Sequence, residues 1–111
     1  MSQNYSIQKV EELAGGDQEF IKVLVNTFLE EISQDLKKLI NAAENNNPAM
    51  AYQYAHKMKP SFQLFNVAVI PQINEMEGWS KGEIDFEKAQ QVAHFIRENV
   101  EKALEELSND F

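Results

Sequence analysis

The spacing of apolar residues between Asp17 and Asn45 constrains the fold more than any other feature of the chain. At 100° per residue, the apolar positions of this stretch fall within an arc of roughly 120°, as they do in a long amphipathic helix. These positions are Ile21, Leu24, Val25, Phe28, Ile32, Leu36, Leu39 and Ala43. No segment alternates apolar and polar residues with a period of two, so we expect no strands.

Capping residues predict where this helix and the next one begin and end. Asp17 is a good N-cap for the long helix. The Asn-rich segment that starts at Asn45 stops it, and Asn47 followed by Pro48 starts a third helix. That third helix should end near Asn66, a residue type that tolerates the left-handed conformation. Its apolar stripe consists of Ala51, Ala55, Met58, Phe62 and Phe65.

Three more helices complete the prediction. Pro71 fits the first turn of a fourth helix from about Ile70 to about Lys81. Asp85 should cap a fifth helix with the stripe Phe86, Ala89, Ala93, Ile96, Val100, Ala103 and Leu107. A short first helix with Ile7, Val10 and Leu13 on one face should end at Gly15-Gly16. We therefore expect an all-α fold, an antiparallel four-helix bundle with a short extra N-terminal helix, as a single domain over residues 1–111.

Composition excludes several classes of function. The formal net charge of -8 argues against binding to nucleic acid or to an anionic membrane, since both would repel the chain. The absence of cysteine excludes disulfides, thiolate metal sites and cysteine nucleophiles. The N-terminus has neither a basic nor an apolar region of a signal peptide, and no apolar run approaches the length of a membrane span. We expect a cytoplasmic protein.

Acidic residues are missing from one part of the chain. The segment from Asn45 to Asn74 contains no Asp or Glu, although 18 acids in 111 residues would place about 5 there by composition alone. On the predicted third helix, Tyr52, His56, Lys59 and Gln63 recur at intervals of four, three and four residues and so form one ridge. A histidine flanked by lysines on an acid-free surface suits a phosphoryl group. The alternative is a chance gap in the acids around an idle histidine.

Other chemistries lack the residues they need. Two histidines without a Glu-x-x-His pair do not suggest the zinc or di-iron sites found in helical proteins, so we expect no metal and no cofactor. No glycine-rich loop leads into Lys-Ser or Lys-Thr, which argues against nucleotide hydrolysis. His94 lies about 130° from the centre of the fifth helix's stripe, where an ordinary exposed residue is expected.

The residues around His56 carry a likeness to a known family. The segment 55–61, Ala-His-Lys-Met-Lys-Pro-Ser, and the positions after it resemble the signature of histidine-containing phosphotransfer (HPt) domains. His56, Met58 and Lys59 match the histidine, aliphatic and lysine positions of that signature, and Ile70 matches its closing aliphatic residue. Pro60 and Asn66 stand where the family usually has glycine. The resemblance covers essentially the whole chain, including the segment from Val10 through Gly15-Gly16-Asp17.

The resemblance implies a phosphorelay intermediate without catalytic activity of its own. His56 would accept the phosphoryl group, Lys59 would hold its oxygens, and Tyr52, Lys57, Pro60 and Gln63 would lie in the docking surface. Lys57 and Gln63 are equally well explained as solvated surface residues. The implied partners are response-regulator receiver domains and a hybrid histidine kinase, with the receiver supplying Mg²⁺. The chain itself is expected to be a monomer.

Pro60 departs from both the family pattern and the rules for helices. A proline inside a helix cannot donate to the carbonyl of the residue four positions earlier, which here is His56. We expect the third helix to continue through Pro60 with a bend that tilts His56 outward; a tolerated substitution on an exposed face is the other explanation. A module that binds receivers or other signalling proteins without phosphorylation remains the alternative function.

Overall fold

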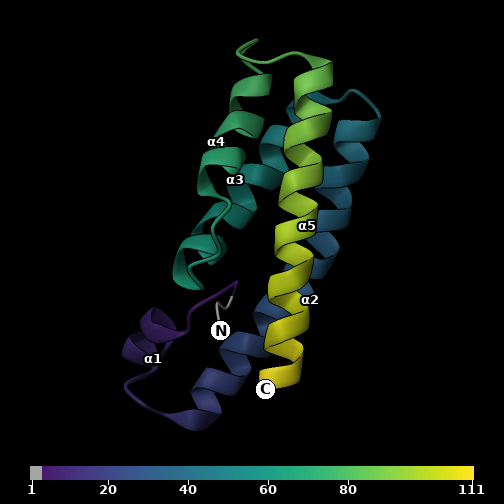
Figure 1. Cartoon of the computed structure of the whole chain (residues 1–111). Helices are drawn as coiled ribbons and strands as arrows, with labels where there is room; N and C mark the ends of the chain where they lie inside the picture. The colour runs from purple at the N-terminus through teal and green to yellow at the C-terminus, as the bar shows by residue number, and fades with distance from the viewer. Residues whose placement is uncertain (1–3) are drawn as a thin grey trace.

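The computed structural model describes residues 4–111 and is helical throughout, with no strand in that range. The five helices are α1 (Gln8–Ala14), α2 (Gln18–Glu44), α3 (Pro48–Leu64), α4 (Ile70–Trp79) and α5 (Phe86–Asp110) (Figure 1). The expectation of an all-α chain without strands is therefore confirmed. None of the helices among residues 4–111 is long and apolar enough to cross a membrane.

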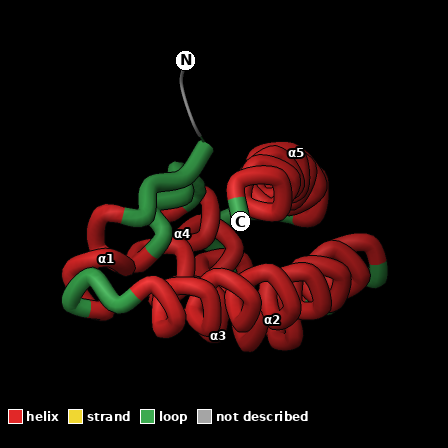
Figure 2. Tube along the Cα trace, turned by 90° about the horizontal axis from the view of Figure 1, so that it is seen from below, coloured by secondary structure: helices red, strands yellow, loops and turns green. Residues whose placement is uncertain are grey.

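The four longer helices surround a common core. α3 packs against α2 and α4, and α5 packs against the same two helices from the other side. The molecule measures 44 × 24 × 20 Å, and α2 and α5 run along its long axis (Figure 1). Short loops join the helices (Figure 2). The predicted stripe of α3 is buried at all its positions, and the stripe of α2 is buried except at the half-buried Leu24.

The predicted N-caps are in place. The Asp17 carboxylate accepts hydrogen bonds from the backbone N–H groups of Glu19 and Phe20, at 3.0 and 3.3 Å. The side chain of Asn47 accepts from Met50 at 3.2 Å, and that of Asp85 accepts from Lys88 at 2.8 Å. These bonds satisfy N–H groups that the first turn of a helix leaves without partners.

Asn66 reverses the chain between α3 and α4. Its φ of 52° lies in the left-handed region, as predicted, and the N–H of Val67 donates to the carbonyl of Phe62 at 2.9 Å. This pattern closes the end of α3. It turns the chain so that α4 packs back along α3, which places the two helices side by side for the site described below.

Three details of the sequence-based prediction are wrong. α4 ends at Trp79 rather than at Lys81, because the N–H of Lys81 already bonds to the carbonyl of Gly78 in a closing turn. Leu13 is 60% exposed, since the seven-residue α1 buries only Val10. Phe86 is 45% exposed because it is the first residue of α5, and burial begins only one turn later at Ala89.

An aromatic cluster fixes α3 against α2. The ring centroid of Phe28 lies 4.1 Å from that of Phe65 and 6.4 Å from that of Phe62, the latter pair edge to face. Aromatic pairs of this kind contribute roughly 0.5–1.5 kcal/mol beyond the area they bury. Because the inner face of α3 is held in this way, the direction of its outer face is also set.

Candidate functional site

His56 lies in the middle of α3 on its outer face. Its side chain is 67% exposed, whereas Ala55, Met58 and Phe62 beside it are buried. Lys59, one turn further along, has a half-buried side chain on the same side of the helix. The prediction of an exposed, mid-helix histidine with Lys59 beside it is therefore confirmed.

A single carboxylate from α4 joins these two residues. Glu77 Oε2 lies 2.9 Å from His56 Nδ1, and Glu77 Oε1 lies 2.9 Å from Lys59 Nζ. The Glu77 side chain is only 12% exposed. The expectation of an acid-free surface around His56 is thus wrong: no acid lies nearby in the sequence, but the turn after α3 brings one from the neighbouring helix.

The contacts of Glu77 keep its carboxyl group ionised. Partial burial alone would raise its pKa, but hydrogen bonds from Lys59 and from His56, and the positive charges of those groups, outweigh burial and lower the pKa below its usual value. Glu77 therefore acts only as a hydrogen-bond acceptor near neutral pH.

The hydrogen bond to the Glu77 carboxylate determines the tautomer of the neutral His56 ring. Because an ionised carboxylate has no proton to donate, His56 Nδ1 carries the proton and donates it to Glu77. The Nε2 atom then holds the free lone pair. The assignment rests on the hydrogen bond rather than on an observed proton, and it leaves Nε2 as the ring nitrogen with an available lone pair.

The Tyr52 ring lies parallel to the same imidazole in an offset stack. The two rings are parallel to within 6°, and their centroids are 5.7 Å apart. Tyr52 lies one turn before His56 on α3 and is half-buried. Two of the other three predicted ridge residues therefore lie around His56, since Tyr52 stacks on its ring and Lys59 shares Glu77 with it. Gln63 is exposed, and its backbone carbonyl accepts a long hydrogen bond from Lys9 Nζ at 3.5 Å.

Lys57 has a partner that the sequence did not reveal. Its Nζ lies 3.2 and 3.1 Å from the two carboxylate oxygens of Asp35 on α2. Asp35 is 4% exposed and is the one buried charged residue in the region 4–111. A buried carboxylate needs such a partner, so Lys57 stabilises the contact between α2 and α3 rather than remaining a freely solvated lysine.

Pro60 is exposed, and α3 continues through it to Leu64. Proline has no N–H group, so the carbonyl of His56 lacks its usual donor four residues later. The helix therefore continues through this position as expected, and the bend stays a prediction.

Metal ligands do not gather at this site. No group of three or more His, Asp or Glu side chains that could hold an ion occurs in the part of the chain from residue 4 onward. Glu77 is the acid in contact with His56, and its two carboxylate oxygens are already hydrogen-bonded to His56 Nδ1 and Lys59 Nζ.

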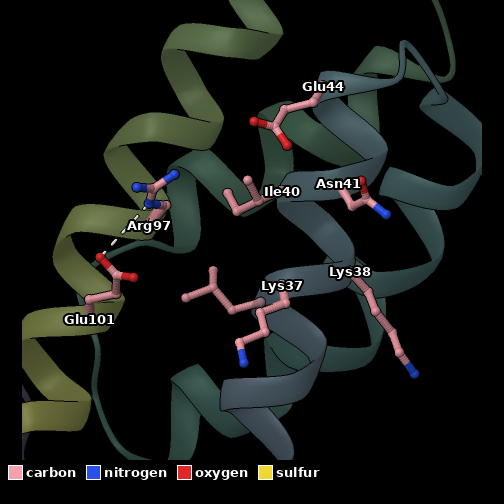
Figure 3. Close-up of a pocket in the computed structure, with 8 residues that line it drawn as sticks. Lys37, Lys38, Ile40, Asn41, Glu44, Arg97 and Glu101 are labelled. Atoms are coloured by element: carbon pink, nitrogen blue, oxygen red, sulfur yellow. Dashed lines mark ion pairs between the residues drawn. The ribbon is translucent and has the colours of Figure 1, made fainter.

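A groove lies between α2 and α5, away from His56. This groove of about 430 Å³ is lined by Leu36, Lys37, Lys38, Ile40, Asn41, Glu44, Arg97 and Glu101. Figure 3 shows Arg97 and Ile40 turned toward the space between the helices and Lys38 turned away from it. Arg97 Nε lies 3.8 Å from Glu101, so charges of both signs line the groove. It shares no residue with the His56 site.

Comparisons of the chain with models of protein families, with curated proteins and with solved structures give no significant match. A functional conclusion therefore rests on the geometry around His56.

Proposed function

We propose that the protein is a phosphoryl carrier that accepts a phosphoryl group on His56 from a receiver-domain aspartyl phosphate and passes it to another receiver. The observation that carries the proposal is the hydrogen bond between His56 Nδ1 and Glu77, which leaves Nε2 of an exposed ring as the nucleophile. The match of His56, Met58 and Lys59 to the HPt signature supports the same conclusion. We also infer that α2 to α5 form an antiparallel four-helix bundle.

The proposed step is an in-line transfer between two side chains. The lone pair of Nε2 forms a bond to phosphorus while the bond from phosphorus to the receiver's aspartate oxygen breaks, and that aspartate leaves as a carboxylate. The ring becomes positively charged because it keeps its proton on Nδ1. Glu77 accepts a hydrogen bond from that proton, so its negative charge favours the charged product over the neutral starting ring.

Lys59 would stabilise the transferred group. An ammonium group has three donors, and Glu77 uses one of them, so two remain for phosphoryl oxygens. A hydrogen bond to a charged group contributes roughly 1.5–3 kcal/mol. The same carboxylate therefore holds both the proton on His56 Nδ1 and the ammonium group of Lys59.

The proposal implies partners that complete the chemistry. A receiver domain would supply Mg²⁺, because phosphoryl transfer generally uses a cation to neutralise the negative charge of the transferred group. A hybrid histidine kinase would be the source of the phosphoryl group upstream, and a cytoplasmic monomer would meet both. The carrier would have no catalytic activity in the absence of a receiver.

The test is a phosphoryl-transfer time course with purified receiver domains. Incubation of the chain with a phosphorylated receiver and Mg²⁺ should give acid-labile label on the chain, and addition of a second receiver should remove it. Failure of every receiver to label a chain that binds several of them tightly would overturn the proposal.

One observation favours a second candidate, a module that binds signalling proteins without being phosphorylated. Both lysines that flank His56 are paired with carboxylates, Lys57 with Asp35 and Lys59 with Glu77. The surface around His56 therefore has less unpaired positive charge than the sequence predicts. The labelling experiment separates the two functions, since a binding module would form complexes and take up no label.

A further inference from the structure

We propose that Tyr52 is a positioning residue, whose ring holds the imidazole of His56 in the one orientation that presents Nε2 to a docked phosphoryl donor. This inference rests on the proposed function, because it concerns the same histidine. It assigns a specific task to a side chain that does not itself touch the reacting atoms.

The hydrogen bond to Glu77 leaves one motion of the imidazole unrestrained. It fixes the distance from Nδ1 to the carboxylate, 2.9 Å, but a hydrogen bond tolerates a range of angles, so small coupled rotations about the Cα–Cβ and Cβ–Cγ bonds can still tilt the ring plane. Such a rotation would change the direction in which the lone pair of Nε2 points. A ring stacked parallel to the imidazole opposes this rotation, and Tyr52 is stacked in this way, at an interplanar angle of 6° and a centroid distance of 5.7 Å.

The contact involves the face of Tyr52 and not its hydroxyl group. No hydrogen bond of the Tyr52 hydroxyl occurs within residues 4–111, whereas its ring stacks on His56 at 5.7 Å. Replacement of Tyr52 by phenylalanine should therefore leave the phosphorylation rate of His56 unchanged, whereas replacement by leucine should lower it. The energy typical of an aromatic pair corresponds to about a two- to tenfold preference for the stacked orientation. The rate of attack should follow that preference, since attack requires an aligned nucleophile.

Tyr54 offers a matched control on the same helix. It is also half-buried, but its ring lies under Lys38 Nζ, 5.5 Å from the ring centroid, and makes no ring contact with His56 among the described residues. Replacing Tyr54 by leucine removes an aromatic ring of the same size from α3 while leaving the stack on His56 in place. It therefore controls for a general loss of packing.

The experiment uses potassium phosphoramidate, a small phosphoryl donor that needs no receiver. Nε2 forms a bond to phosphorus, the donor's phosphorus–nitrogen bond breaks, and ammonia leaves. Tyr52→Leu should phosphorylate at His56 about two to ten times more slowly than the wild type, whereas Tyr52→Phe and Tyr54→Leu should keep the wild-type rate. Thermal unfolding of each variant checks that it is folded.

A spectroscopic readout tests the stack independently of reactivity. The carbon-bound protons of the His56 ring should show an upfield ring-current shift in the wild type and in Tyr52→Phe, and this shift should be lost in Tyr52→Leu. Equal rates for Tyr52→Leu and the wild type would overturn the inference, as would a Tyr52→Phe variant as slow as Tyr52→Leu. If phosphoramidate did not phosphorylate the wild type, this result would count against the proposed function. The proton shifts would still decide whether Tyr52 orients the ring.

Discussion

The protein has two histidines, and by exposure alone they are alike. The side chain of His56 on α3 is 67% exposed, and that of His94 on α5 is 69% exposed, as expected for an ordinary surface residue. Each lies near a carboxylate, Glu77 for His56 and Glu98 for His94. Neither solvent exposure nor an acidic neighbour therefore distinguishes the candidate site from the rest of the surface.

The two carboxylates differ in their origin and in the nitrogen they approach. Glu77 comes from a different helix, is 12% exposed and lies 2.9 Å from Nδ1 of His56. Glu98 is four residues away on the same helix, is 58% exposed and lies 3.6 Å from Nε2 of His94. Exposed pairs at this spacing contribute only about 0.3–0.5 kcal/mol. A short tertiary contact therefore restrains the His56 ring more than a long, solvated contact within one helix restrains that of His94.

The sharpest test of this comparison removes each histidine in turn. His56→Gln eliminates the nucleophilic nitrogen and should abolish the uptake of acid-labile phosphate from a phosphorylated receiver. His94→Gln should keep the wild-type rate. Because both side chains are exposed, each substitution should change the free energy of unfolding by no more than about 0.5 kcal/mol.

Labelling and thermal unfolding of the two variants check this prediction. Label that persists on His56→Gln, or that disappears from His94→Gln while the variant is folded, would contradict the assignment of the site to α3.

The next test removes the carboxylates instead. Glu77→Gln loses the negative charge that holds the proton on Nδ1 and favours the charged ring after transfer, so the transfer rate should fall about 10- to 100-fold, the range expected for one hydrogen bond between charged groups. Glu98→Gln is the matched control on α5 and should transfer at the wild-type rate. In ¹⁵N NMR spectra, Glu77→Gln should shift the tautomer balance of His56 and leave that of His94 unchanged.

Most of the helices could be predicted because their signals are local. The side chains of Asp17, Asn47 and Asp85 bond to N–H groups no more than three residues away, and Asn66 needs only its own backbone to turn the chain. Sequence and structure agree at these positions, since the hydrogen bonds involve neighbouring residues. Whether a residue at the end of a helix is buried, such as Phe86, depends on where the neighbouring helices end. The spacing of apolar residues along one helix does not predict this.

The ion pairs of the site could not be predicted from spacing along one helix. Glu77 lies 21 residues after His56, and Asp35 lies 22 residues before Lys57. Both pairs nevertheless obey a simple rule: two helices joined by a short turn place residues at similar distances from that turn side by side. Asp35 and Lys57 each lie eleven residues from Asn46, one before it and one after it. This rule would have placed Glu77 opposite His56.

The role proposed for Lys59 gives a smaller expected effect. Lys59→Ala removes one charge-assisted contact to the phosphoryl oxygens and should slow transfer about tenfold. Lys102→Ala on α5 removes an exposed lysine far from His56 in sequence and should have no effect on the rate. A time course with the same receiver measures both variants. A Lys59→Ala variant that transfers as fast as Lys102→Ala would remove Lys59 from the proposed mechanism.

The lowered pKa of Glu77 predicts a pH dependence of stability. Because its carboxyl group has a lower pKa in the folded chain than the usual 4.5, ionised Glu77 stabilises the fold above that pH, and this contribution is lost as the pH falls through the lowered value. The difference in free energy of unfolding between wild type and Glu77→Gln should therefore shrink as the pH falls below about 4.5. Urea unfolding at several pH values measures this difference; a difference that stays constant would contradict the prediction.

The last comparison concerns the backbone, since α3 contains Pro60 and the long helix α5 contains no proline. A proline inside a helix costs about 3 kcal/mol relative to alanine, whereas the more restricted unfolded chain recovers up to about 1 kcal/mol. Pro60→Ala should therefore raise the free energy of unfolding by about 2 kcal/mol and straighten α3, while Lys102→Ala on α5 should change it by less than about 0.5 kcal/mol. Chemical denaturation checks both values. A destabilised Pro60→Ala variant would mean that the exposed proline ring makes a packing contact that outweighs the missing hydrogen bond to His56.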